Sequence, residues 1–518
     1  MDRSSHLYLL ITSLLLLQWL IDYSSAKSDI NTDRSSLLAF KSQISFDPHN
    51  ILTKNWSSGS NICSWIGVTC DSRYHRVTQL NISSMGLVGT IPPEIGNLFF
   101  LVSLDLSENS FRDPIPSSIF NMSSLEVLKL RNNSLSSSLS IDMCKDNLHR
   151  LKRLHISYNK LFGEIPSSLE QCSQLEYVSL TSNNFSGRVP TQIGNLTLLQ
   201  ELYLSSNNLI GNIPKEIATL TNLGSLDLSI NNFVGHVPRK IANLPMLQSL
   251  DLRTNKLSGP IPKELGRLVN LWELQLNYNF LVNGSIPKEM GNMTSLSYLL
   301  LSSNELSGEI PNEIFLLNNL LDLNIGSNRL SGSLPREIGN TTIQNMWIYE
   351  NNLSGPIPST SVNESRLINF ALHSHNLNGK IPASICNLRS LKILYLSNNS
   401  LEGAVPDCLG NMSTSLLILY LNANKLSGLI QSTFTKGCSL PINLNGNRLN
   451  GTLPQTLVNC HRLWDLDIGD NEIRGKFPDT RGLVSRDNCE RSQRRYWFVR
   501  GKIPVEQPTI VQLRILIM

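Results

Sequence analysis

Short alternations of apolar and polar residues recur along most of the chain. In residues 101–116, LVSLDLSENSFRDPIP, the side chains of Leu101, Leu104 and Leu106 fall on one face, and those of Ser103 and Asp105 fall on the other. A period of two over so few residues predicts a short strand with one buried face. The chain should therefore contain many such strands, one in each copy of the motif.

Proline spacing gives the length of the repeat. Pro190, Pro214, Pro238 and Pro262 lie 24 residues apart, and separations of 23 to 25 residues continue as far as Pro406. Self-similarity at this period, with L-x-x-L-x-L-x-x-N-x-L inside it, is typical of leucine-rich repeats. Because one repeat cannot bury its leucines alone, the predicted fold is an α/β leucine-rich-repeat solenoid with a curved parallel β-sheet on its concave face. About 17 coils at about 4.8 Å each predict a rod roughly 80 Å long.

An asparagine follows each predicted strand, and its inward-facing carboxamide can satisfy backbone N–H and C=O groups where the chain turns. The predicted ladder consists of Asn109, Asn133, Asn159, Asn183, Asn207, Asn231, Asn255, Asn279, Asn304, Asn328, Asn351, Asn399, Asn424, Asn447 and Asn471. Met85 and His375 interrupt it. Met85 lies at the end of the stack, and we expect His375 to be a structural histidine with satisfied nitrogen atoms.

The second half of each repeat reads L-x-G-x-I-P. Glycine permits a tight turn, and proline fixes φ and removes a hydrogen-bond donor. This predicts an extended segment along the flank of each coil that does not pair with another strand.

Charge and the N-terminus indicate where the protein works. Lys and Arg number 44 against 40 Asp and Glu, a net charge of +4, so no strong field indicates a nucleic-acid partner. Arg3 precedes an apolar run at residues 7–21, and residues 24–26 are small, which predicts a secretory signal peptide over residues 1–26. A membrane anchor is the alternative, but the run is shorter than the roughly 20 residues that span a bilayer.

Two motifs carry a resemblance to a known family. The L-x-G-x-I-P half-repeat resembles that of plant extracellular leucine-rich repeats, and CSWIGVTC at residues 63–70, after TDRSSLLAFKSQI, resembles the paired-cysteine end of the plant N-terminal cap. The chain is thus similar to the ectodomains of plant receptor-like kinases and receptor-like proteins. The resemblance implies a cap over residues 27–76 with a Cys63–Cys70 disulfide, and about 17 plant-type repeats of about 24 residues over residues 77–479.

Different parts of the array resemble different subfamilies. Residues 77–111 resemble the receptor kinases that sense bacterial flagellin and elongation factor, and residues 396–428 resemble resistance-type receptor-like proteins, which lack a kinase. After residue 479 the period is lost. Residues 480–518 are a divergent tail without a paired-cysteine C-terminal cap, a transmembrane span or kinase motifs.

Cysteine spacing indicates further disulfides. Three pairs lie close to one repeat apart, within disulfide reach on adjacent coils. They are Cys144 with Cys172, Cys386 with Cys408, and Cys438 with Cys460. Buried free thiols are the alternative.

Asn-x-Ser/Thr sequons are frequent, as in secreted glycoproteins, although chance produces some in a chain rich in Asn and Ser. They begin at Asn55, Asn81, Asn121, Asn132, Asn184, Asn195, Asn283, Asn292, Asn340, Asn352, Asn363, Asn398, Asn411 and Asn450.

Ligand-binding residues are expected on the concave strand face, where the repeat does not dictate the residue. Aromatic rings that anchor peptides and proteins gather there late in the chain, although strand propensity alone could place them. The candidates are Tyr298, Leu300, Trp347, Tyr349, His373, Tyr395 and Tyr420. A second, basic candidate comprises Lys129, Arg131, Arg153 and His155, which could take a carboxylate or sulfate of a ligand or could simply be solvated.

By resemblance, we predict a non-enzymatic recognition module of a plant cell-surface receptor in immune or developmental signalling. It would bind an extracellular peptide or protein and signal through a co-receptor kinase, at the outer face of the plasma membrane or in the apoplast. No Ser/His/Asp or metal-ligand spacing recurs, so we expect no catalytic residue, metal or cofactor. The alternatives are a soluble secreted binder or decoy, similar to polygalacturonase-inhibiting proteins, and a truncated receptor kinase.

Overall fold

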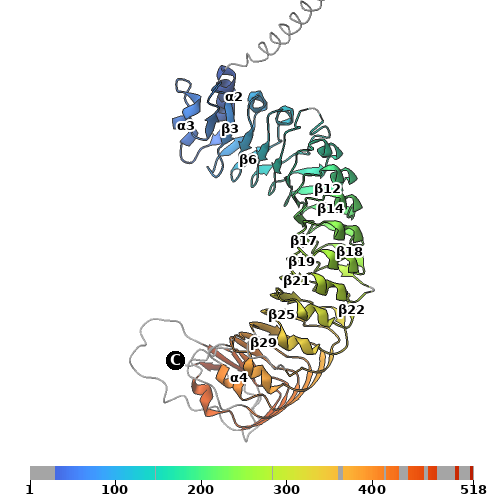
Figure 1. Ribbon diagram of the computed structural model, residues 1–518. Helices are drawn as coiled ribbons and strands as arrows, with labels where there is room; N and C mark the ends of the chain where they lie inside the picture. The colour runs from blue at the N-terminus through green and yellow to red at the C-terminus, as the bar shows by residue number, and fades with distance from the viewer. Residues whose placement is uncertain are drawn as a thin grey trace, which may run out of the picture. The chain divides into compact units, whose positions relative to one another are not determined.

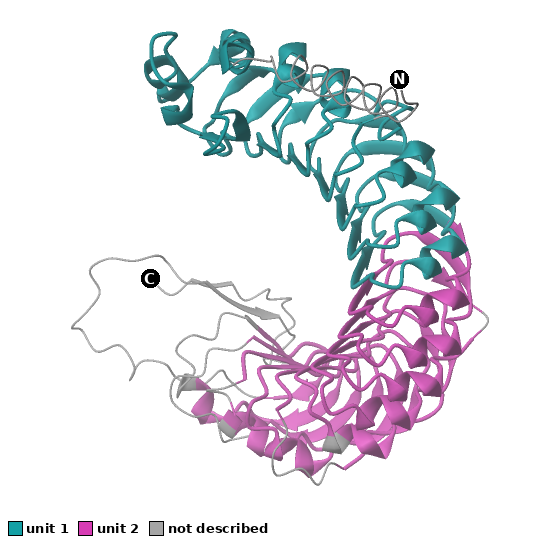
Figure 2. Ribbon diagram, turned by 45° about the horizontal axis from the view of Figure 1, so that its top comes forward, with its two compact units in different colours: residues 1–233 teal, residues 234–518 magenta. Residues whose placement is uncertain are grey.

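The computed structural model describes residues 30–474 except 146, 283, 360–365, 413–415, 431–440 and 460–464, together with the backbone of two later strands. The chain divides into unit 1, residues 1–233, and unit 2, residues 234–518 (Figure 2). The predicted signal peptide and most of the predicted tail lie outside the described residues. No helix in the described part has the length and apolar character needed to cross a membrane.

Unit 1 begins with a cap that closes the first coil. Its elements are α2 (Ile30–Ser42), β1 (Ile44–Phe46), α3 (Ile51–Asn55), η1 (Ile62–Ser64) and β2 (Val68–Cys70). In α2, Phe40 is fully buried against Phe111 of the second coil, with 5.6 Å between ring centroids. Buried Asp33 accepts hydrogen bonds from the Arg76 guanidinium at 2.6 and 2.8 Å. A buried carboxylate is stable there because it is both paired and hydrogen-bonded.

The leucine-bearing strands form a parallel sheet in each unit, on the side that we call the inner face (Figure 1). In unit 1 they are β3 (Val77–Asn81), β5 (Ser103–Asp105), β7 (Val127–Lys129), β9 (Arg153–His155), β11 (Tyr177–Ser179), β13 (Glu201–Tyr203) and β15 (Ser225–Asp227). In unit 2 they are β17 (Ser249–Asp251), β19 (Glu273–Gln275), β21 (Tyr298–Leu300), β23 (Asp322–Asn324), β25 (Asn345–Trp347), β27 (Asn369–Ala371), β29 (Ile393–Tyr395), β31 (Ile418–Tyr420), β33 (Ile442–Asn443) and β35 (Asp465–Asp467). Adjacent strands pair residue for residue one repeat apart, as Tyr298 does with Asp322, so the central leucines stack into a core within each unit.

The flank of the coils differs from the prediction, because its segments pair with one another. In unit 1 the flank strands are β4 (Val88–Thr90), β6 (Ser110–Asp113), β8 (Ser134–Leu135), β10 (Phe162–Glu164), β12 (Asn184–Arg188) and β14 (Asn208–Asn212), and β16 (Asn232–Gly235) crosses into unit 2. In unit 2 they are β18 (Lys256–Gly259), β20 (Phe280–Leu281), β22 (Ser307–Gly308), β24 (Arg329–Leu330), β26 (Ser354–Pro356), β28 (Asn376–Lys380), β30 (Ser400–Gly403), β32 (Lys425–Leu429), β34 (Arg448–Gly451) and β36 (Glu472–Ile473). The prolines come after most of these strands, so they leave the backbone of the L-x-G segment free to pair with the next coil.

Short helices occupy the outer side, and most are 3-10 rather than α. In unit 1 they are η2 (Pro93–Asn97), η3 (Ser117–Asn121), η4 (Ser167–Gln171), η5 (Thr191–Asn195) and η6 (Lys215–Thr219). In unit 2 they are η7 (Arg239–Asn243), η8 (Lys263–Arg267), η9 (Lys288–Asn292), η10 (Asn312–Leu316), η11 (Arg336–Asn340), η12 (Ala383–Asn387), α4 (Cys408–Asn411) and η14 (Gln455–Asn459). Most begin directly after the repeat's proline, whose φ near −65° suits the position before a helical turn. Beyond the array, the backbone of β37 (Tyr496–Arg500) pairs in parallel with β35 and antiparallel with β38 (Arg514–Leu516).

The asparagine ladder is present in the structure. Asn207 accepts from the backbone N–H of Phe185 at 3.0 Å and donates to the carbonyls of Leu180, Leu204 and Ser205 at 3.0 to 3.1 Å. The other predicted members make the same kind of bonds, for example Asn304 in unit 2. In most repeats the residue just before the ladder asparagine has a positive φ near 50–57°, which turns the chain out of the strand. The carboxamide therefore satisfies backbone groups that this turn removes from the sheet.

His375 replaces the asparagine only in part. Its Nδ1 lies 3.0 Å from the Asn351 carbonyl oxygen and 3.2 Å from the Asn351 nitrogen, so one backbone group at a time can be bonded. Its buried Nε2 has no hydrogen-bond partner among the described residues. The expectation that both nitrogen atoms are satisfied is therefore wrong, because only Nδ1 lies within hydrogen-bond distance of the backbone groups of Asn351.

Candidate functional site

Three columns of side chains cover the inner face. The first and third residues of each strand and the residue two positions later point away from the leucine core, as in Glu273, Gln275 and Asn277. Several of these positions are nevertheless buried by their neighbours: Asp251 and Gln275 are 7% and 8% exposed, and Ala371 is fully buried. Sequence reasoning treated this column as open surface, but large side chains on adjacent strands cover the smaller ones.

Four predicted residues of unit 2 form a continuous run of rings, which we call the aromatic row: Tyr349, His373, Tyr395 and Tyr420. The Tyr349 and His373 rings stack at 5.0 Å with an interplanar angle of 2°. His373 meets Tyr395 edge-on at 5.8 Å, and Tyr395 stacks on Tyr420 at 5.0 Å. The rings come from four successive repeats, so the parallel register brings them together. Each ring is held by its neighbours, which lowers the entropy that a ligand would cost it.

Gly326 makes room for the first ring of the aromatic row. A Cβ at position 326 would lie 2.6 Å from the Tyr349 ring, so the missing side chain lets that ring lie across the neighbouring strand. Sequence reasoning did not single out Gly326. Its position in the column of Tyr349 is visible in the repeat alignment, but the direction of the ring is not.

The aromatic row is uncharged at neutral pH. Burial lowers the pKa of His373, opposed by the charge of Glu350, so the imidazole is neutral. Burial raises the pKa of Tyr349 and of Tyr395. Trp347 is half-buried on β25, in the column beside Tyr349. Ligand contact with this region would rest on apolar area and ring edges.

Tyr298 contacts a ring that the sequence analysis did not name. It is 37% exposed and meets Trp272, 41% exposed, in an edge-to-face contact at 5.8 Å. Leu300 is half-buried on the same strand. The sequence analysis did not name Trp272, which lies one residue before β19, although an exposed tryptophan is itself a signal of binding.

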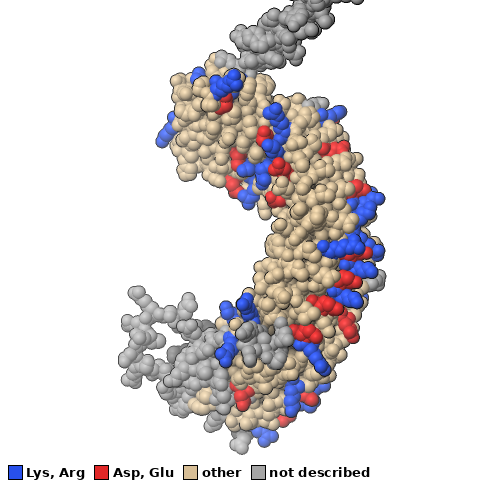
Figure 3. Space-filling model, in the orientation of Figure 1, with Lys and Arg blue, Asp and Glu red and all other residues tan. Residues whose placement is uncertain are grey.

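The four basic candidates of unit 1 lie together. The register of β7 and β9 places Lys129 opposite His155, with Arg153 on the same strand and Arg131 following β7. Acidic residues already engage two of the four: Lys129 lies 3.5 Å from Asp105, and Arg131 pairs with Glu108. Figure 3 shows the resulting mixture of blue and red atoms on unit 1.

Arg153 and His155 instead contact an aromatic ring. The Arg153 guanidinium lies 4.3 Å from the centroid of Tyr177, and the His155 ring meets the same tyrosine edge-on at 5.4 Å. Burial, with the charges of Arg131, Lys129 and Arg153, lowers the pKa of His155 to about 4. The imidazole is therefore neutral at physiological pH and adds no positive charge to the group.

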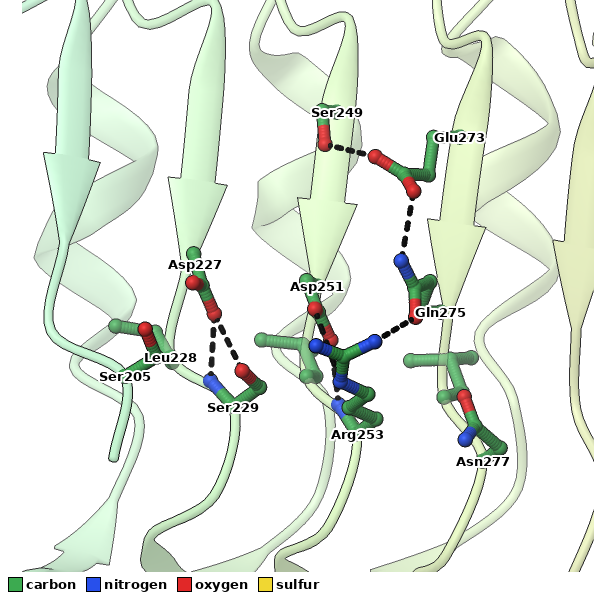
Figure 4. A network of polar contacts seen from close by, with 12 residues as sticks. Ser205, Asp227, Leu228, Ser229, Ser249, Asp251, Arg253, Glu273, Gln275 and Asn277 are labelled. Carbon is green, nitrogen blue, oxygen red and sulfur yellow. Dashed lines mark hydrogen bonds and ion pairs between the residues drawn. The ribbon is translucent and has the colours of Figure 1, made fainter. Parts of the chain in front are cut away.

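Where unit 2 begins, the inner face is polar (Figure 4). Arg253 lies between Asp251, at 3.4 Å, and Gln275, to which it donates at 2.8 Å. Gln275 in turn donates to Glu273 at 2.6 Å, and Ser249 donates to the other oxygen of that carboxylate at 2.8 Å. The network fixes the side chains of two adjacent strands.

A groove of about 990 Å³ lies on the flank of unit 2, away from the inner face. Prolines that end successive L-x-G-x-I-P segments and carboxylates of the short helices after them line it, among them Pro262, Pro287, Glu264 and Glu289. These residues belong to the regular repeat, so the groove follows from the scaffold. In the described part of the chain no group of three or more His, Cys, Asp or Glu side chains could hold a metal ion.

Three disulfides join pairs that the sequence analysis named: Cys63 with Cys70, Cys144 with Cys172, and Cys386 with Cys408. Cys438 and Cys460, the fourth predicted pair, both lie outside the described residues, as do the sequon residues Asn283 and Asn363. Several sequon residues are exposed on the outer side, such as Asn121, Asn195 and Asn292. The Asn55 side chain accepts a hydrogen bond from the Ile66 N–H at 2.6 Å and so has a structural partner.

Comparison with known proteins agrees with this architecture. The leucine rich repeat N-terminal domain matches residues 30–71, the leucine-rich repeat region matches residues 166–283, and single leucine rich repeats match residues 100–122, 150–172, 295–317 and 390–412. The solved structure of PEPR1–AtPEP1 is 30% identical, with 90% of this chain and 76% of that chain covered and a TM-score of 0.68. The chain belongs to the plant leucine-rich-repeat receptor family.

Other members of this receptor family give the same result. The plant peptide hormone receptor RGFR1 in complex with RGF2 is 30% identical, with coverage of 80% of this chain and 81% of that chain and a TM-score of 0.67. Among curated relatives, the LRR receptor-like serine/threonine-protein kinase EFR of Arabidopsis thaliana is 40% identical over 111 residues, 21% of this chain and 11% of that protein. Receptor-like protein 7 of Arabidopsis thaliana is 30% identical over 192 residues, 30% of this chain and 19% of that protein. The matched stretches thus span only 8% to 24% of the length of such relatives.

Proposed function

We propose that this chain is the extracellular recognition part of a plant cell-surface receptor, and that it binds a peptide or protein on the inner face of unit 2. The observation that carries the proposal is the aromatic row, four rings in contact at positions that the repeat leaves free. Such rings are typical of interface hot spots, since they supply large contact area at little entropic cost. Two of the similar solved structures carry a second molecule in their names: one is PEPR1–AtPEP1, and the other is RGFR1 in complex with RGF2.

Signalling would then require a second protein. The proposed receptor acts without its own catalysis in this part of the chain: ligand binding would recruit a co-receptor kinase at the outer face of the plasma membrane. Aromatic anchors contact many different peptides and proteins, so the aromatic row fits an immune ligand and a developmental ligand equally well. The four basic residues of unit 1 remain a second candidate surface, for a carboxylate or sulfate of the same ligand.

The test is a selection of displayed random peptides on the secreted protein, followed by affinity measurements with the synthetic peptides recovered. We expect the variant with Trp347→Ala, Tyr395→Ala and Tyr420→Ala to lose at least ten-fold in affinity while keeping its melting temperature within a few degrees. Gly326→Ala should also weaken binding, because its Cβ displaces Tyr349.

The matched control is Phe280→Ala, which removes a ring that is 55% exposed on the flank of unit 2. It should leave the affinity unchanged. Peptides that bind the triple variant as tightly as the unaltered protein would show that the aromatic row is not the binding site.

A further inference from the structure

A second set of inner-face residues in unit 2 is defined by the sheet register. Glu273 of β19 lies opposite Tyr298 of β21, and Tyr298 lies opposite Asp322 of β23. The three side chains form one row across three adjacent strands, with Trp272 against Tyr298. We call Trp272, Glu273, Tyr298 and Asp322 the acidic–aromatic row.

Neither carboxylate has a positively charged partner. None of the ion pairs in the described part of the chain includes Glu273 or Asp322. Asp322 is half-buried and accepts one hydrogen bond, from the Asn345 amide at 3.0 Å. Burial raises the pKa of Asp322, against the lowering effect of that hydrogen bond. Burying a carboxylate without a cation is costly, so the folded protein gains nothing from this arrangement.

A basic side chain on the same face, Arg253, already has partners. Arg253 lies against Asp251 and donates to Gln275, as Figure 4 shows. Gln275, a neutral amide, stands between this arginine and Glu273. Gln275 therefore separates the Arg253 guanidinium from the Glu273 carboxylate of the acidic–aromatic row.

Two further observations, independent of the carboxylates, indicate an external donor. Trp272 and Tyr298 are 41% and 37% exposed, and their edge-to-face contact leaves apolar ring surface beside the acids. Asn277, which follows the end of β19 and lies beyond Gln275 from Glu273, is 8% exposed, and its buried Oδ1 accepts no hydrogen bond among the described residues. The acidic–aromatic row therefore offers carboxylates and ring surface, and neither carboxylate is in an ion pair within the described residues.

We propose that the acidic–aromatic row is a subsite for an arginine side chain of the ligand. A guanidinium suits it because its planar group can lie on Tyr298 or Trp272 while its N–H groups bond a carboxylate. The inference rests on the proposed function, since it assumes that the inner face of unit 2 meets the ligand. The inference adds a property of the ligand to the proposed function: the ligand carries a basic residue beside the part that contacts the aromatic row.

The direct test uses tetra-arginine amide as the probe and tetra-citrulline amide as its neutral isostere, in 150 mM NaCl. We expect tetra-arginine to bind at least ten-fold more tightly than tetra-citrulline and to change the tryptophan fluorescence. The double variant Glu273→Gln, Asp322→Asn should lose at least ten-fold in tetra-arginine affinity. General attraction of a polycation is disfavoured, because the chain carries a net charge of +4.

Two controls keep the result interpretable. Glu305→Gln removes one negative charge from unit 2 at a carboxylate already paired with Arg329 at 3.1 Å, and it should leave the affinity unchanged. Trp272→Ala removes an exposed ring and should weaken binding several-fold without unfolding. The double variant should keep its melting temperature at pH 7, because the carboxylates it removes have no counter-ion.

Equal affinity of the double variant and the unaltered protein for tetra-arginine would overturn the inference. Failure of the two proposals can be told apart with the selected peptides. If these peptides need the aromatic row but bind the double variant unchanged and contain no basic residue, the arginine subsite is wrong and the proposed function stands. If they bind the Trp347→Ala, Tyr395→Ala, Tyr420→Ala variant unchanged, the proposed function is wrong.

Discussion

The inner faces of the two units carry different chemistry on the same scaffold. In unit 1, charged side chains of adjacent strands are paired with one another, as Lys129 is with Asp105 and Arg131 with Glu108. In unit 2 the aromatic row runs through four successive repeats, and Asp322 is in no ion pair within the described residues. Beneath both surfaces run the same leucines and the same asparagine bonds.

The difference separates what stabilises the protein from what it offers to a ligand. A charge that is already paired within the fold contributes little to the free energy of binding a partner. An unpaired carboxylate or a half-exposed ring can contribute more. Unit 2 therefore has the surface more suited to recognition, and unit 1 the surface more suited to remaining soluble. The experiments below test each side of this comparison.

The largest expected effect should be equal in both units, because the asparagine ladder is common to them. Asn207→Ala in unit 1 and Asn304→Ala in unit 2 each remove four hydrogen bonds to buried backbone groups. Each should lower the free energy of unfolding by about 1–3 kcal/mol, measured by denaturant titration. Asn208→Ala, at an exposed position beside the ladder, is the control and should have little effect. A loss in only one unit would show that the ladder does not support the two units alike.

A smaller effect should be confined to unit 2. His375→Asn should raise the free energy of unfolding by about 1 kcal/mol, because asparagine can also accept from the Leu353 N–H, which lacks this bond in the described structure. Burial lowers the pKa of His375, against hydrogen bonds to the backbone, so the unfolded chain binds a proton more readily. The histidine form should therefore lose stability as the pH falls below about 6.5, its unfolded pKa.

The His375→Asn variant should lose less stability in that pH range than the unaltered protein. The difference between their melting temperatures should therefore widen toward pH 5. His373 and His155 are common to both proteins, so their titration cancels in the difference. A constant gap from pH 8 to pH 5 would contradict the pH part of this prediction.

The smallest effect belongs to unit 1. Arg131→Met removes a partly exposed ion pair with Glu108 and keeps much of the apolar stem, so the free energy of unfolding should change by about 0–1 kcal/mol. The change should shrink further in 1 M NaCl, because salt screens exposed charges. A loss of several kcal/mol that persists in salt would contradict this prediction, because it would mean that the charge pair stabilises the fold of unit 1.

Most of the scaffold could be predicted from the sequence because its signals are local and repeated. The leucine positions, the ladder and the proline period each occur in nearly every unit, so one error does not change the pattern. The flank sheet could not be predicted in the same way. Its strands are only two to five residues long, and their pairing depends on the alignment of neighbouring coils.

The candidate site was predictable as a set of residues but not as an arrangement. Tyr349, His373, Tyr395 and Tyr420 were named from their columns, yet their order of contact depends on ring orientation. The sequence analysis did not name Trp272, which lies one residue before β19. The missing counter-ion of Asp322 could not be seen from the sequence, since arginines and lysines occur throughout the chain.

The sequence alone determined the solenoid, its period and the face on which variable residues lie, because a repeat that must stack on its own copies permits one register. Only the tertiary structure decided which side chains, one repeat apart, satisfy one another. Gly326 gives the Tyr349 ring its place, Gln275 stands between Arg253 and Glu273, and Ala371 is covered. These contacts depend on side-chain direction and on the size of neighbours about 24 residues away. Neither can be read from the sequence of one repeat alone.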